Sequence, residues 1–204
     1  LLIFSLLAYL FWPEPSLEQQ MQNRHVPAVG IGVIEEGKVT RKEVLGELEA
    51  GVAATPDAIF NVASLTTPVF AMLVLKLVEL GEWDLDSPIH PYWIDHEIKE
   101  DARHELLTTR ILLSHQSGFP NWRWNHSSGK LAFEFDPGTR YQYSGEGFEY
   151  LKYAIQQKIG KPLQLLADSL LFTPLGLSHS SLVWGADMAQ QPFAKWHDKN
   201  GGVY

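Results

Sequence analysis

The sequence contains no cysteine among its 204 residues, which excludes disulfide bonds, thiolate catalysis and zinc sites built on cysteine. It also has no run of basic residues, and its formal net charge at pH 7 is -8. Binding to a phosphate backbone requires clustered Lys and Arg, so no nucleic-acid partner is expected. The absence of cysteine by itself leaves the cellular compartment open.

Two motifs that mark common classes of hydrolase are also missing. The chain has neither the Gly-x-Ser-x-Gly elbow of α/β-hydrolases nor the His-Glu-x-x-His pattern of zinc peptidases. His90, Asp95, His96 and His104 lie close together in sequence, but without regular ligand spacing. We therefore expect surface histidines there, with no metal site and no organic cofactor.

What the chain does contain is apolar sequence, 45% of its residues, which is enough for the core of one sizeable domain. Residues 1–12 are almost entirely apolar and end at Pro13. Such a run is short for a membrane span and is typical of a signal-peptide core or part of an anchor. We expect an exported protein that is periplasmic, secreted or membrane-anchored. Residues 1–24 would be a leader with a polar surface helix from Ser16 to Arg24, and residues 25–204 the domain.

A β-hairpin is predicted at the start of the domain. Apolar residues alternate with Gly30 and Gly32 from Val29 to Val33, which indicates a strand with one nearly bare face, as when a helix packs closely on a sheet. Residues 35–38 read as the turn and residues 39–45 as the returning strand.

The most informative stretch runs from Phe60 to Phe70, where an extended segment passes into a long apolar helix with Ser64 at the junction. A serine there can act as a nucleophile, because a helix start is partially positive and exposes backbone N–H groups to an oxyanion. A purely structural alternative makes Thr67 the N-cap and Pro68 the first helical residue. The helix itself, up to Leu80, is apolar nearly all round and is predicted to be buried on almost every side.

Four segments, in this order, resemble the serine β-lactamase and penicillin-binding protein superfamily, in its branch of class C β-lactamases, D-aminopeptidases and esterases. The resemblance covers about residues 25–180. The segments are Ile59 to Thr66, Leu112 to Pro120 with its Leu-Leu-x-His-x-Ser-Gly pattern, Pro137-Gly138-Thr139 with Tyr143, and Pro174 to Leu177.

This resemblance implies an α/β (α+β) fold of the β-lactamase/transpeptidase type. Such a fold has an antiparallel sheet flanked by helices and a helical subdomain. The third family motif, Lys-Thr-Gly or His-x-Gly on a core strand, does not occur in this chain. We therefore expect an incomplete domain that lacks the C-terminal strands, and the oligomeric state is left open.

The resemblance also assigns the site. Ser64 would be the nucleophile and Tyr143 would shuttle the proton, while Thr67 stands where the family has the lysine of Ser-x-x-Lys. A threonine hydroxyl is not basic at neutral pH, so this replacement is expected to impair activation of the serine. Ser144 and Gly145 complete the family's Tyr-x-Asn segment as substrate-binding positions, with Gly145 in place of the asparagine.

Ser144 and Trp122 each have more than one interpretation. Ser144 is also a candidate N-cap for a helix that would end at Gly160. The segment 121–126 is either a packed loop or part of a cleft wall in which Trp122 stacks on a substrate. His115 is a structural feature in the related family and is interpreted in the same way here.

The sequence thus predicts a serine hydrolase that acts through an acyl-enzyme on a β-lactam, a D-amino-acid peptide or an ester. Its partner would be a small-molecule or peptide substrate. The alternative is a pseudoenzyme that binds peptidoglycan-like peptides or a protein partner, which the altered positions Thr67 and Gly145 favour. A third possibility is an active enzyme in which a mutation replaced the lysine.

Overall fold

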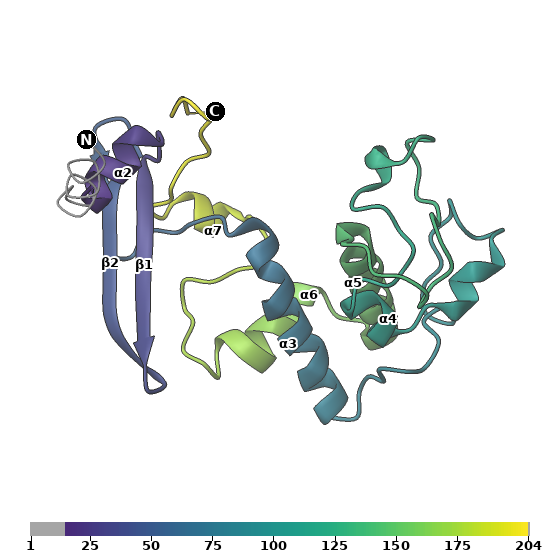
Figure 1. Cartoon of the computed structure of the whole chain (residues 1–204). Coiled ribbons are helices and arrows are strands. Elements are labelled where there is room, and N and C mark those ends of the chain that lie inside the picture. Colours follow the sequence, from purple (N-terminus) through teal and green to yellow (C-terminus); the bar gives the residue numbers. More distant parts are fainter. Residues whose placement is uncertain (1–14, 204) are drawn as a thin grey trace, which may run out of the picture. The chain divides into compact units, whose positions relative to one another are not determined.

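The computed structural model describes residues 15–203, which form two compact units (Figure 1). One unit contains residues 15–61 and 184–203, and the other contains residues 62–183. The apolar segment 1–12 that predicts a signal peptide or anchor lies outside the described residues. Within the described part of the chain, no helix combines the length and apolar character that crossing a membrane requires.

The first unit is built on a three-stranded antiparallel sheet in the order β1 (Ala28–Glu35), β2 (Lys38–Glu49) and β3 (Val52–Ala53). The two residues of the first turn, Glu36 and Gly37, both have positive φ, which suits the twist of a two-residue hairpin. The predicted hairpin is therefore confirmed, with longer strands than expected.

Two short helices complete this unit. Helix α2 (Leu17–Asn23) lies beside the hairpin, and the side chain of Ser16 caps its first turn in a capping box with Gln19 (Figure 1). Helix α7 (Ala186–Ala189) belongs to the C-terminal part of the unit. A methyl group added to Gly30 would lie 3.5 Å from the ring of Phe60, so within this unit an aromatic ring, not a helix, covers that glycine.

The second unit is helical, with short connections and no strand of its own among residues 62–183. Its elements, in chain order, are η1 (Ala63–Leu65), α3 (Thr66–Glu79), η2 (Ala102–Leu106), α4 (Thr109–Leu113), η3 (Arg123–Asn125), α5 (Gly145–Ile159), α6 (Leu163–Ala167) and η4 (Asp168–Phe172). Their apolar faces form one core, and its fully buried members include Leu73, Leu107, Phe119, Leu151 and Ile155.

Helix α3 enters this core with one face only. Phe70, Leu73, Val74 and Leu77 are buried, because the spacing i, i+3, i+4, i+7 places them on one side of the helix. Met72 and Leu75 are half exposed, as is Leu80 just after the helix. The prediction that the helix is buried on almost every side is therefore wrong.

His104 corrects a second expectation. Its side chain is buried instead of lying on the surface, 6.0 Å from the ring of His90. Its Nδ1 atom has no hydrogen-bond partner among the described residues. His96 is exposed as expected, while Asp95 is buried in a cluster of charges described below.

Candidate active site

Ser64 lies on the single turn η1, directly before α3, and its residue is exposed. The preceding residue, Ala63, has a φ of 44°. Left-handed backbone is uncommon for a residue with a Cβ and stores strain, which tends to be retained at functional positions. The predicted nucleophile therefore lies on a tight, strained turn at the start of a 14-residue helix.

Thr67 is held against the same turn. Its hydroxyl donates a hydrogen bond to the backbone carbonyl of Ser64 at 2.8 Å. The N-cap of α3 is Leu65, without a side-chain bond, so the structural alternative in which Thr67 is the N-cap is wrong. Because Pro68 lies in the first helical turn, its missing N–H removes no hydrogen bond within the helix. The side chain at position 67 thus points back over the turn that carries Ser64.

Tyr143 is connected to α3 through a run of aromatic contacts. The ring of Phe70 on α3 lies 5.7 Å from that of Phe148, and Phe148 lies 5.1 Å from His115. His115 in turn packs on Tyr143, with ring centroids 4.4 Å apart. These ring contacts join helix α3, at Phe70, to Tyr143.

His115 also holds the backbone beside Tyr143. Its Nδ1 atom accepts a hydrogen bond from the backbone N–H of Ser144 at 3.1 Å. An atom that accepts a hydrogen bond needs a free lone pair, so the ring is neutral and its proton is on Nε2. Burial lowers the pKa of His115 below its ordinary value, which is consistent with this neutral form.

We expect the wild-type protein to lose more unfolding free energy than a His115→Gln variant when the pH falls from about 7 to about 5. The pKa of His115 is lowered in the folded state, so below roughly pH 6.5 the unfolded chain binds the proton more readily. The contribution of the neutral His115 ring to the free energy of unfolding is complete above that pH. It is lost as the pH falls toward the lowered pKa of His115. Urea unfolding of both proteins across this range measures the difference, and parallel curves would contradict the prediction.

Ser144 caps helix α5, as the sequence alternative proposed. It is 1% exposed, and its hydroxyl accepts from the backbone N–H of Gly147 at 3.0 Å and donates to the carbonyl of Pro120 at 2.8 Å. The helix ends, as predicted, at Gly160, which is left-handed with a φ of 71°. These two hydrogen bonds give Ser144 a structural role, because they fix the start of α5 to the backbone at Pro120. A contact between Ser144 and a substrate stays a prediction.

Gly145 is buried under the indole of Trp122. A Cβ atom at position 145 would lie 2.6 to 2.9 Å from three carbon atoms of that ring, closer than real Cβ contacts. The backbone N–H of Gly145 donates to the side-chain carbonyl of Asn121 at 3.0 Å. Trp122 therefore occupies the space that an asparagine side chain at position 145 would need. This packing explains why position 145 is a glycine in this chain.

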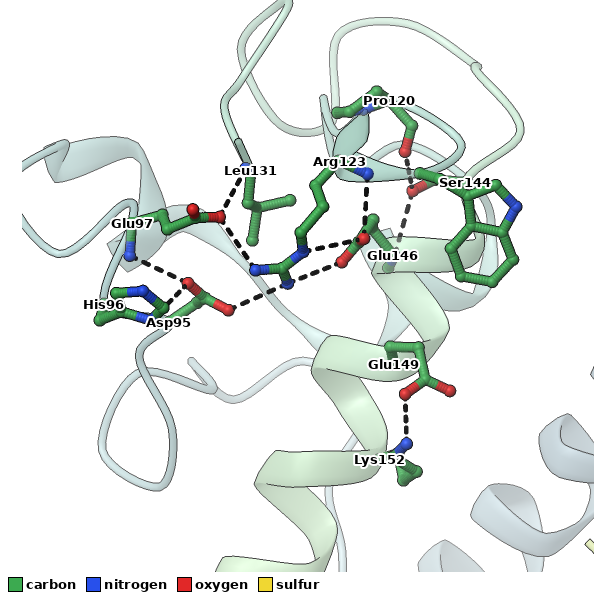
Figure 2. Close-up of polar contacts among 12 residues, drawn as sticks. Asp95, His96, Glu97, Pro120, Arg123, Leu131, Ser144, Glu146, Glu149 and Lys152 are labelled. Atoms are coloured by element: carbon green, nitrogen blue, oxygen red, sulfur yellow. Dashed lines mark hydrogen bonds and ion pairs between the residues drawn. The ribbon is translucent and has the colours of Figure 1, made fainter. Parts of the chain in front are cut away.

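Arg123 gathers three carboxylates around one guanidinium (Figure 2). It donates to both oxygens of Glu146 at 3.1 and 2.9 Å, to Glu97 at 2.9 Å and to Asp95 at 3.1 Å. Its backbone N–H also donates to Glu146 at 3.0 Å. The hydrogen bonds to Glu146 are the largest cause that raises the pKa of Arg123, which stays charged. This group, Arg123 with Asp95, Glu97 and Glu146, is called the Arg123 cluster below.

The Arg123 cluster could not be predicted from the sequence. Its members are 23 to 28 residues apart from Arg123 along the chain and share no motif. The only signal is that Glu146 is an acidic residue in the first turn of a capped helix, which is common on solvated helices as well.

The family assignment rests on a match over nearly the whole chain. The model of the protein family described as Beta-lactamase matches residues 15–201. The chain belongs to the beta-lactamase family. Among curated proteins, it is similar to the esterase EstB of Burkholderia gladioli, with 30% identity over 191 residues that cover 79% of this chain and 48% of that protein. It is also similar to the protein flp of Staphylococcus aureus, with 23% identity over 182 residues, 81% of this chain and 36% of that protein.

Solved structures confirm the β-lactamase/transpeptidase-like fold, with its mixture of antiparallel sheet and helices. The D-alanine carboxypeptidase AmpC from Burkholderia cenocepacia has a TM-score of 0.75 at 22% identity, over 90% of this chain and 52% of that one. The octameric penicillin-binding protein homologue from Pyrococcus abyssi has a TM-score of 0.74 at 24% identity, over 99% of this chain and 50% of that one. The chain thus spans about half, or less, of the length of these similar proteins. By their names, they include an esterase and a D-alanine carboxypeptidase.

Proposed function

We propose that the protein is a serine hydrolase that cleaves an ester or amide through an acyl-enzyme on Ser64. The observation that carries the proposal is the position of Ser64, exposed on a strained turn at the N-terminus of α3. The partial positive charge of the helix start favours the negative charge that develops during attack on a carbonyl. Substrates of the proposed class are carboxylic esters, D-amino-acid peptides and β-lactams, and the 30% identity to an esterase favours esters.

In the proposed reaction the Oγ atom of Ser64 attacks the acyl carbon, and the bond to the leaving alcohol or amine breaks. Tyr143 takes the serine proton and passes it to the leaving group. Water then attacks the acyl-enzyme, releases the acid and returns the proton to Ser64. Thr67 contributes no base, so we propose that acylation is slow in this chain.

A second candidate is a binding protein that has the family's fold without its chemistry. Two observations favour it. Position 67 carries a threonine whose hydroxyl is engaged with the Ser64 carbonyl, and position 145 has no side chain and is covered by Trp122. Its proposed ligand is a peptidoglycan-like peptide or a protein partner.

Intact mass spectrometry after incubation with a fluorophosphonate and with a penicillin distinguishes the two. A mass increase on the wild-type protein that is absent in Ser64→Ala supports the hydrolase. A mass increase that appears only in Thr67→Lys supports the binding protein. Labelling that persists in Ser64→Ala would overturn the assignment of Ser64.

We also propose that the protein is exported or membrane-anchored. This proposal rests on the apolar residues 1–12 alone. Fractionation of cells that express the full-length protein tests it, and recovery with the cytoplasmic fraction would overturn it.

A further inference from the structure

Trp124 presents a large flat apolar face to solvent. Its side chain belongs to η3 and is 67% exposed. One face of the indole stacks on Trp122, with ring centroids 5.2 Å apart and planes only 12° from parallel. The other face has room for a third ring, since the residue remains mostly exposed.

The two indoles are held by the backbone between them. Arg123, the residue that separates them, is anchored by the five hydrogen bonds of the Arg123 cluster described above. The backbone N–H of Trp122 donates to the side-chain carbonyl of Asn125 at 3.1 Å, which closes the turn. An aromatic residue on a rigid turn loses little conformational entropy when a ligand stacks on it.

Trp122 of this pair lies against one of the proposed substrate-binding positions. The indole of Trp122 packs directly over Gly145, two residues after Tyr143. Gly145, Trp122 and Trp124 therefore form a layered arrangement that leads outward from the backbone beside Tyr143. A substrate that reaches Trp124 from Tyr143 needs a spacer between its reacting carbonyl and the group that stacks.

We propose that Trp122 and Trp124 form a platform for an aromatic ring in the acyl part of the substrate, with Trp124 as the residue that contacts it. This inference rests on the proposed hydrolase function and names its substrate class as uncharged aryl-alkyl esters and amides. Flat aromatic rings stack favourably on indole. The Arg123 cluster next to the platform has three carboxylates for one guanidinium, so its excess negative charge disfavours an anionic acyl group.

The first test compares two esters with the same leaving group, ethyl 4-phenylbutyrate and ethyl butyrate, with the full-length protein in a pH-stat. We expect Trp124→Ala to raise KM for the phenyl ester about 2- to 10-fold, the range of one aromatic pair, and to leave ethyl butyrate unchanged. Trp124→Phe should keep KM for the phenyl ester close to the wild-type value, because it keeps a flat ring at this position. Trp196→Ala, which removes a tryptophan that is 60% exposed in the other unit, is the matched control and should change neither ester.

A second test does not depend on catalysis. The Ser64→Ala protein is titrated with 4-phenylbutyramide, and the indole N–H signal of Trp124, assigned by its loss in Trp124→Phe, is followed by NMR. A saturable shift of that signal supports the platform even if no ester is hydrolysed, in which case only the proposed function fails. No shift, or equal effects of Trp124→Ala on both esters, overturns the platform. A change in oligomeric state in Trp124→Ala without any effect on the probe would also overturn it and make the patch a protein interface.

Discussion

Replacement of Arg123 by alanine is expected to lower the free energy of unfolding by about 3 kcal/mol, the low end of the range for breaking a buried ion pair. Glu146 and Asp95 have side chains that are only 5% and 9% exposed, and the substitution leaves both without their cation. We use the low end of this energy range because the side chain of Arg123 is 30% exposed, so that water partly screens its charge. For a chain of this size the melting temperature should fall by roughly 6 to 12 °C.

Urea and thermal unfolding of matched variants measure this effect. Arg110→Ala removes the guanidinium that pairs with Asp86 where both side chains are at least 60% exposed, so it should change stability little. A loss no larger than that of Arg110→Ala would show that the Arg123 cluster does not stabilise the unit.

Replacement of Thr67 by lysine is expected to raise the rate of acylation of Ser64 by roughly 10²- to 10⁴-fold, the usual contribution of a positioned general base. The side chain of Thr67 already turns back to the carbonyl of Ser64 at 2.8 Å, so a longer side chain from the same position starts beside the nucleophile. A neutral amine can accept the serine proton, which a threonine hydroxyl cannot do.

Single-turnover kinetics with a chromogenic ester measure the acylation rate. Thr67→Met provides a long side chain without the amine and should give no gain, and Ser64→Ala combined with Thr67→Lys should remain inactive. The gain should also increase with pH, because only the neutral amine is a base. Equal rates in Thr67→Lys and Thr67→Met would show that position 67 does not hold the base.

Local features of this protein were predictable from the sequence. The turn at Glu36 and Gly37 follows the alternating segment from Val29 to Val33, and the hairpin forms there. Ser144 and Gly160 mark the start and end of α5, because a cap side chain and a left-handed glycine act on backbone groups within one turn. The position of Ser64 before α3 was predictable because an extended segment passes into a long apolar helix there, although the strained φ of Ala63 was not.

The sequence predictions were wrong where the burial of a side chain depends on which other elements pack against it. The composition of α3 predicted burial on almost every side, yet Met72 and Leu75 are half exposed, because the core of the unit contacts one face of the helix. His104 was expected on the surface and is buried. Composition measures how apolar a segment is, but it does not tell which neighbours are present to cover it.

The sequence by itself determined the family, the hairpin and the limits of α5, while the roles of Ser64, Thr67 and Tyr143 stay predictions. Only the tertiary structure decided that Trp122 fills the space above Gly145 and that Arg123 binds three distant carboxylates. Hydrogen-bond caps and turns act between residues that are close along the chain, so local sequence predicts them. Charge clusters and ring contacts join residues from separate loops and helices, and their formation depends on how the whole chain packs.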